Sequence, residues 1–171
     1  INIIDTPGHA DFGGEVERVL SMVDSVLLLV DAVDGPMPQT GFVTKKALQA
    51  GLRPIVVINK VDRDGARPDW VLDQTFDLFD RLGADENQLD FPVVYASAIQ
   101  GWATEDLSNK TDNMDTIFET IINNVAAPKV DPNGNLQIQV SALSYSSYVG
   151  LIGTGRIRSC LIYTSPSPRD Y

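Results

Sequence analysis

The chain has 171 residues, of which 43% are hydrophobic and 21% charged, a balance typical of a globular protein. A formal net charge of −10 excludes a domain that binds nucleic acid through its overall charge alone, although a local basic patch on an acidic body stays possible. The single cysteine, Cys160, cannot form an intramolecular disulfide, which favours a reducing compartment, and no apolar run is long enough to span a membrane.

The chain begins with an apolar run, Ile1–Ile4, which predicts a buried strand ending at Asp5. An acid at the end of such a strand suits a metal ion beside a phosphate, and the Pro7-Gly8 turn offers a free backbone N–H next to it. Apolar residues then recur at helical spacing over 15–23. The pair Gly13-Gly14 in front of that helix fits either a segment that moves or a plain loop.

Three more apolar runs predict buried strands over 25–30, 55–58 and 91–96, and helical patterns follow them over 42–50, 69–82 and 115–125. Asp69 is the expected N-cap of the second of these helices. Strands that alternate with helices predict βαβ units and a mostly parallel sheet, which is an α/β fold. Ligands bind such sheets at the carboxyl ends of the strands, where this sequence places Asp5, Asn59, Lys60, Asp62 and Ser97.

The pattern changes after residue 127, which ends the first predicted domain. Residues 127–134 are rich in Pro, Asp, Asn and Gly and predict a linker. Residues 136–142 alternate apolar and polar side chains, and 149–157 form a Gly-rich strand or hairpin. We therefore expect the start of an all-β domain over 128–158.

The segment Asn59-Lys60-Val61-Asp62 carries the most specific chemical signal. The Asp62 carboxylate can accept hydrogen bonds from N1–H and the exocyclic amine of guanine, whereas adenine presents an acceptor at N1 and is rejected. Asn59 can hold the loop and approach the purine edge, and the stem of Lys60 can lie over the ring. The alternative is a polar turn after a strand, and the motifs on either side favour guanine recognition.

The opening motif fits the phosphate end of the same nucleotide. Asp5 would hold Mg²⁺ through a water, Gly8 would donate its N–H to the terminal phosphate, and His9 would orient the attacking water. A surface histidine in a turn is the alternative for His9. Its place directly after Pro7-Gly8 favours the catalytic role.

Taken together, Asp5-Thr6-Pro7-Gly8-His9, Asn59-Lys60-Val61-Asp62 and Ser97-Ala98 resemble three nucleotide motifs of the translational GTPases. The finer resemblance is to the ribosome-associated TypA/BipA GTPases and covers about residues 1–158. Its segments are Asp11–Asp24, Gly35–Thr40, Gly65–Trp70 and Tyr145–Gly150. This resemblance implies a P-loop NTPase-type fold followed by a β-barrel, with GTP or GDP and Mg²⁺ as ligands.

The resemblance also implies roles for single residues and for the whole protein. The backbone around Ser97 and Ala98 would contact the guanine oxygen, beside the base-reading Asn59, Lys60, Val61 and Asp62. The expected function is GTP hydrolysis coupled to ribosome binding in large-subunit assembly and stress adaptation. The expected partners are rRNA and ribosomal proteins in the cytoplasm, without a membrane or DNA. The alternative is a GTP-sensing assembly scaffold in which hydrolysis is incidental.

The sequence departs from the family pattern in two places. It contains no G-x-x-x-x-G-K-[ST] phosphate loop and no switch I threonine, so we expect this chain by itself not to hydrolyse GTP and to bind it poorly. On that reading the chain as given has no function of its own, whereas the parent protein has. The Ser/Pro-rich segment 159–171 also fails to match, and translated vector sequence is favoured over a divergent or disordered end.

Overall fold

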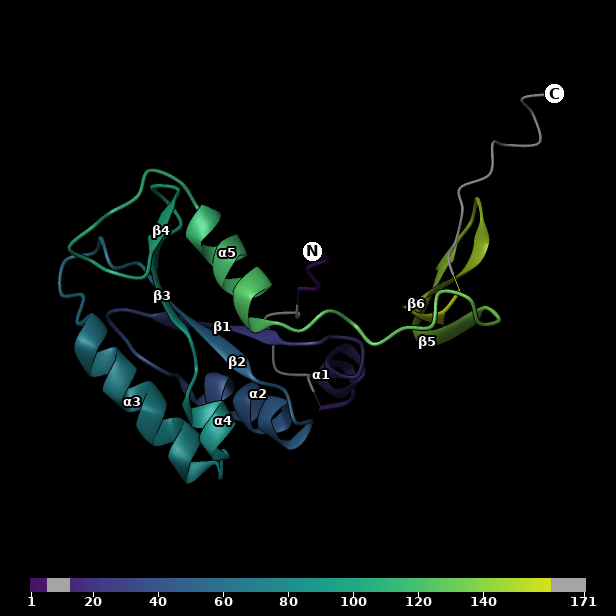
Figure 1. Ribbon diagram of the computed structural model, residues 1–171, viewed down its shortest axis with the longest axis horizontal. Coiled ribbons are helices and arrows are strands. Elements are labelled where there is room, and N and C mark those ends of the chain that lie inside the picture. The colour runs from purple at the N-terminus through teal and green to yellow at the C-terminus, as the bar shows by residue number, and fades with distance from the viewer. Residues whose placement is uncertain (6–12, 161–171) are drawn as a thin grey trace. The chain divides into compact units, whose positions relative to one another are not determined.

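The computed structural model describes residues 1–5 and 13–160, and it divides the chain into two compact units, Ile1–Ala127 and Pro128–Tyr171. The first unit contains a four-stranded sheet in the order β1-β2-β3-β4 (Figure 1). Its elements are α1 (Gly13–Leu20), β1 (Val26–Asp31), α2 (Pro38–Gln49), β2 (Pro54–Asn59), α3 (Pro68–Arg81), α4 (Glu86–Leu89), β3 (Val93–Ser97), β4 (Trp102–Thr104) and α5 (Asp115–Asn124). The predicted α/β fold is confirmed.

Strand β2 is one of the two inner strands of the sheet, and it pairs in parallel with β1 on one side and with β3 on the other. Its residues Ile55–Ile58 are all buried, because both neighbours and both faces of the strand are covered. The register sets Asp31 beside Asn59 and Asn59 beside Ala96. Ser97 follows Ala96 as the last residue of β3, so the sheet brings the polar strand ends Asp31, Asn59 and Ser97 to one edge.

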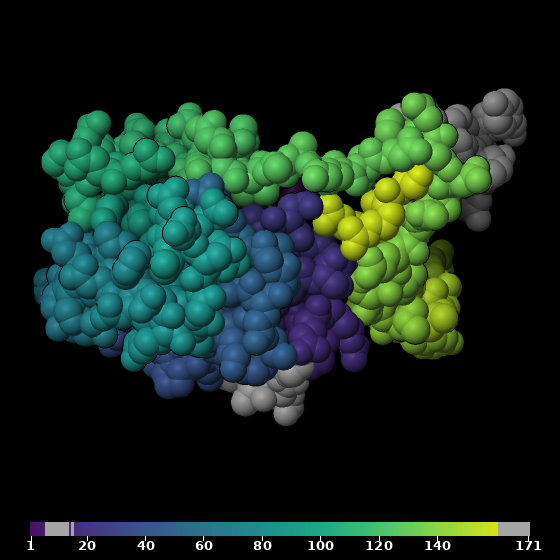
Figure 2. All heavy atoms as spheres, turned by 60° about the horizontal axis from the view of Figure 1, so that its bottom comes forward, coloured from purple at the N-terminus to yellow at the C-terminus, as the bar shows by residue number. Residues whose placement is uncertain are grey.

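Helices cover the two faces of this sheet (Figure 1). On one face, Val71 and Phe79 of α3 pack with Val56 and Ile58 of β2. On the other face, Ile117 of α5 packs against a cluster from β2, β3 and β4. Figure 2 shows the residues of the middle of this unit, blue to teal, as one closely packed surface.

The strand expected over Ile1–Ile4 is absent, which corrects the prediction for the opening segment. Residues 1–5 have no regular structure, and Ile1 and Ile3 are 68% and 69% exposed. An apolar run becomes a strand only where a neighbouring backbone offers hydrogen-bond partners. In the described part of the chain, β1 pairs only with β2, so no strand pairs with residues 1–5. Leu29 of β1 is 63% exposed, so residues 1–5 do not cover its side chain either.

Three helices begin earlier than predicted, and two of them begin at a proline. Helix α2 starts at Pro38, and α3 starts at Pro68 with Arg67 at its N-cap, so Asp69 lies in the first turn and is not the cap. Proline suits the first helical position because its fixed φ is helical and its missing N–H would have no partner there. The pair Gly13-Gly14 belongs to α1, which excludes the plain-loop interpretation.

Two short elements were not predicted. Helix α4 is opened by a capping box in which the Asp85 side chain accepts from Gln88 N–H at 2.8 Å. Strand β4 pairs antiparallel with β3, and Lys110 lies over the ring of its buried residue Trp102. Helix α4 is tied to the segment before β2, because Gln88 Nε2 donates to Leu48 O at 3.1 Å and to Leu52 O at 3.0 Å, whereas β4 extends the sheet beyond β3.

The second unit contains one antiparallel hairpin, β5 (Gln137–Ser146) and β6 (Gly150–Ser159). Cross-strand pairs such as Ile138–Ile157 and Tyr145–Leu151 place apolar side chains on one face. Antiparallel strands were expected here, and their membership of a β-barrel stays a prediction. Over residues 1–5 and 13–160, no helix is long and apolar enough to cross a membrane.

Candidate functional site

The candidate site is the edge of the sheet where β1, β2 and β3 end. Asp31 is the last residue of β1, Asn59 the last of β2 and Ser97 the last of β3. Parallel pairing aligns these three ends, although the residues are far apart in the sequence. The sheet therefore assembles the loops 59–62 and 97–101 next to one another, whereas Asp5, which was expected at a strand end of the same edge, follows no strand.

Asn59 links the two loops through its side chain. Its Oδ1 accepts a hydrogen bond from the Lys60 backbone N–H at 2.8 Å and another from the Ala98 backbone N–H at 3.1 Å. One amide oxygen thus holds the start of both loops. The backbone adds a third link, because Val61 N–H donates to Ala96 O at 3.3 Å.

Lys60 adopts an uncommon backbone conformation, with a φ of 65°. A side chain with a Cβ in this left-handed region costs roughly 1–2 kcal/mol, so surrounding contacts must hold it there. Asn59 Oδ1 holds its backbone, and Asp31 Oδ2 accepts from its Nζ at 2.6 Å. The residue is fixed at both ends.

Asp31 is the site residue that the sequence analysis did not assign. Burial raises the pKa of its carboxyl, but hydrogen bonds from Lys60, Val33 and Asp34 outweigh burial and hold that pKa below its ordinary value. The carboxylate is therefore charged at neutral pH. An acid at the end of a predicted parallel strand is the signal that could have found it.

Asp62 presents the carboxylate predicted to read the base. Its side chain is exposed, and among the described residues no group bonds to that carboxylate. The neighbouring Val61 packs its side chain against the core below the loop. The loop is thus anchored by one residue and leaves Asp62 available to a ligand.

Ser97 and Ala98 serve the second loop. Ser97 is fully buried, and its backbone oxygen accepts from Gln100 N–H at 3.2 Å and from Gly101 N–H at 2.9 Å. Because Ala98 N–H donates to Asn59, this N–H positions the loop. The contact between the guanine oxygen and the backbone around Ser97 and Ala98 stays a prediction.

The phosphate end of the predicted site lies largely beyond the described residues. Gly8 and His9 fall within 6–12, outside the described part of the chain. Asp5 is described and its side chain is exposed. No group of three His, Cys, Asp or Glu residues in the described ranges could hold a metal ion. A single carboxylate fits an ion whose other ligands are water and phosphate oxygens.

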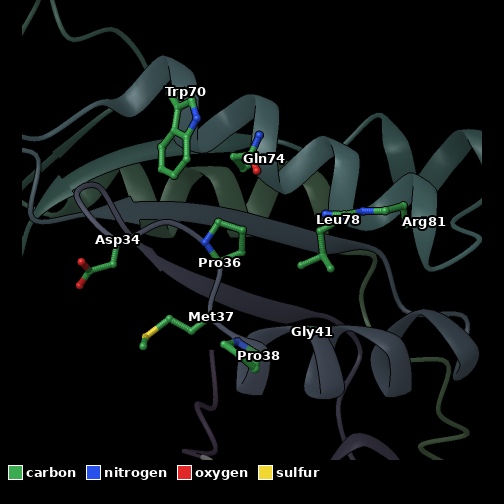
Figure 3. Close-up of a pocket in the computed structure, with 9 residues that line it drawn as sticks. All are labelled: Asp34, Pro36, Met37, Pro38, Gly41, Trp70, Gln74, Leu78 and Arg81. Atoms are coloured by element: carbon green, nitrogen blue, oxygen red, sulfur yellow. The ribbon is translucent and has the colours of Figure 1, made fainter.

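A pocket of about 270 Å³ lies elsewhere, between α3 and the loop that leads into α2 (Figure 3). Trp70, Gln74 and Leu78 of α3 form one side, and Pro36 and Pro38 belong to the other. None of its lining residues belongs to the predicted nucleotide site. Trp70 packs so closely against Gly35 (φ 72°) that a Cβ there would lie 3.1 Å from the indole ring.

Replacing Asn59 with alanine tests the link between the two loops. Asn59→Ala should lower the free energy of unfolding by about 1–2 kcal/mol, because two N–H groups lose their common acceptor. It should also weaken binding of a fluorescent GDP analogue about tenfold in the full-length protein. Denaturation followed by tryptophan fluorescence and a nucleotide titration measure the two effects.

Asn109→Ala is the matched control, since it removes an exposed amide from the loop after β4. It should change the free energy of unfolding by less than about 0.5 kcal/mol. Equal values for the two variants would contradict the linking role of Asn59.

Comparison with known proteins identifies relatives of this chain. A family model described as the elongation factor Tu GTP binding domain matches residues 1–127. The chain is 66% identical over 158 residues to the large ribosomal subunit assembly factor BipA of Escherichia coli K12, covering 92% of this chain and 26% of that protein. The corresponding protein of Haemophilus influenzae is 65% identical over the same shares. That of Buchnera aphidicola is 60% identical over 165 residues, 96% of this chain and 27% of the relative.

These matches confirm the resemblance to the TypA/BipA proteins that the motifs predicted. The chain spans about a quarter of the length of the curated relatives it matches.

Proposed function

Because the chain belongs to the family of the elongation factor Tu GTP-binding domain, we propose that its strand-end loops bind the guanine base of GTP and GDP. The observation that carries this proposal is the single Asn59 oxygen that holds both Lys60 and Ala98. It fixes the base-reading loop and the second loop as one unit. Preorganised loops of this kind bind a ligand without a further cost of ordering.

Within this unit, each residue has a separate task. Asp62 accepts from N1–H and the exocyclic amine of guanine, which excludes adenine. The stem of Lys60 lies along the purine ring. Val61 anchors the loop on the core, and the backbone at Ser97 and Ala98 closes the other side of the base site.

The hydrolytic half of the proposal rests on the motif Asp5–His9. His9 orients the attacking water, and Gly8 donates its N–H to the terminal phosphate. Asp5 would hold Mg²⁺, and the ion would neutralise charge on the phosphates. The sequence contains no phosphate-binding loop of the pattern G-x-x-x-x-G-K-[ST]. We therefore propose hydrolysis for the full-length protein and not for this chain by itself.

The cellular role is a proposal from the relatives. The matched proteins are named large ribosomal subunit assembly factors. We propose that the full-length protein acts on the ribosome in the cytoplasm, with rRNA and ribosomal proteins as partners, and that GTP hydrolysis times its release. The competing proposal is a scaffold that senses GTP without needing to hydrolyse it.

Replacing His9 separates these two proposals. In the full-length protein, His9→Ala should lower ribosome-stimulated GTP turnover at least about a hundredfold, because the attacking water loses its orienting group. GDP affinity should stay within about twofold, since the substitution leaves the base-reading loop intact. Phosphate release and nucleotide titration measure the two quantities.

Release from the ribosome is the second readout of the same variant. If hydrolysis times release, the variant should remain bound to large subunits after GTP addition. Normal assembly activity despite lost turnover would contradict the enzyme proposal and favour the scaffold.

A further inference from the structure

The two carboxylate oxygens of Asp31 join two different segments of the site edge. Oδ1 accepts from Val33 N–H at 2.8 Å and from Asp34 N–H at 3.3 Å, which closes the turn after β1. Oδ2 accepts from Lys60 Nζ at 2.6 Å, and Arg63 Nη1 lies 3.9 Å from it. One side chain thus spans from the turn after β1 to the base-reading loop.

Asp31 is the fixed member of the ion pair. Its side chain is 13% exposed, whereas that of Lys60 is 51% exposed. The backbone of Asp31 is held twice, by its place in the β1–β2 ladder and by Gly35 N–H, which donates to Asp31 O at 2.9 Å. A half-exposed lysine without such a partner would sample many rotamers. The position of the Lys60 ammonium is therefore set by Asp31.

Fixing both ends of Lys60 determines where its apolar stem lies. Asn59 holds the backbone N–H and Asp31 holds the ammonium, so the four methylene groups are stretched between two anchors. That stem starts two residues from Asp62, the carboxylate expected to read the base. A purine bound by Asp62 would therefore contact a lysine stem that is already in position.

We propose that Asp31 is a positioning residue for the guanine nucleotide: it holds the ammonium of Lys60 so that the lysine stem forms one wall of the base site. This inference rests on the proposed function, because it assigns a role within that same site. It differs from a merely stabilising ion pair, since its effect passes through Lys60 to the ligand. It also differs from competition, in which Asp31 would draw Lys60 away from the nucleotide.

Asp31→Asn is the substitution that tests it. The amide keeps an oxygen for the N–H groups of Val33 and Asp34, but its NH₂ group cannot accept from Lys60. In the full-length protein, the affinity for a fluorescent GDP analogue should fall about five- to tenfold, mainly through faster dissociation. Asp34→Asn removes the same charge from the same turn and should change that affinity less than about twofold.

A double-mutant cycle with Lys60→Met distinguishes a positioning role of Asp31 from a purely structural one, because it measures GDP affinity and not stability. If Asp31 acts through Lys60, Lys60→Met should weaken GDP binding by a similar factor, and adding Asp31→Asn should weaken it no further. Lys60 is half-exposed, so Lys60→Met should fold normally. Its GDP affinity can therefore be measured even if Asp31→Asn unfolds early in a thermal melt. Unchanged or tighter GDP binding by Asp31→Asn or Lys60→Met overturns the inference. The inference also fails if adding Asp31→Asn to Lys60→Met lowers the GDP affinity by the same factor as Asp31→Asn does alone.

Two other results separate this inference from the proposed function. If the unaltered full-length protein does not prefer GDP to ADP, the proposed function itself fails. If it does prefer GDP and Asp62→Asn abolishes that preference, while Asp31→Asn binds GDP normally, only the positioning role of Asp31 fails.

Discussion

Asp62→Asn in the full-length protein is expected to weaken GDP binding at least about a hundredfold and to create a preference for xanthosine diphosphate. A carboxylate accepts from both N1–H and the 2-amino group of guanine, whereas an amide turns one of those acceptors into a donor. Xanthine carries an oxygen at the position of that amino group, so it can accept from the new amide. Competition against a fluorescent guanine nucleotide measures both affinities.

The exposed position of Asp62 makes this variant a clean test of recognition. Among the described residues nothing bonds to its carboxylate, so the melting temperature should not change. Asp64→Asn, two residues further along the same exposed loop, is the matched control and should keep the guanine preference. An unaltered preference in Asp62→Asn would exclude this residue as the base reader.

Phe79→Ala is expected to cost about 4 kcal/mol in the free energy of unfolding. The side chain is fully buried between α3 and the sheet, and its ring lies 4.8 Å from that of Phe91, centroid to centroid. Removing it leaves a cavity that its neighbours cannot fill. Both tryptophans, Trp70 and Trp102, belong to the first unit, so urea unfolding followed by tryptophan fluorescence reports on this unit.

Phe76 provides the control on the same helix, because its side chain is 46% exposed. Phe76→Ala should cost less than about 1 kcal/mol. Similar losses for the two variants would contradict the placement of α3 against the sheet.

Two apolar runs of similar composition show what the sequence could and could not predict. Ile55–Ile58 was predicted as a strand and is one, buried between two parallel neighbours. Ile1–Ile4 was predicted by the same argument and has no regular structure. Both runs are mostly apolar, although Ile1–Ile4 includes the polar Asn2, and the main difference lies in whether a neighbouring strand pairs with the run.

The two short elements α4 and β4 were not predicted, for a related reason. Helix α4 has four residues and β4 has three, too few for a periodic pattern to appear. Asp85 and Gln88 have the spacing of a capping box, which is one local sequence signal for α4. Strand β4 had none, because its existence depends on pairing with β3.

The candidate site was predictable in its residues but not in its connections. Asn59, Lys60 and Asp62 follow from motif chemistry at a strand end. The bond from Ala98 to Asn59 and the ion pair of Lys60 with Asp31 join residues 39 and 29 positions apart. Such pairs depend on the register of the sheet, which sequence patterns do not determine.

The central claim is that the loop 59–62 reads a guanine base. Calorimetric titration of the full-length protein with GDP, inosine diphosphate and ADP tests it most directly. The account predicts that GDP binds best, that loss of the 2-amino group in inosine diphosphate costs about tenfold, and that ADP binds at least about a thousandfold more weakly. Equal affinities for GDP and ADP would contradict it.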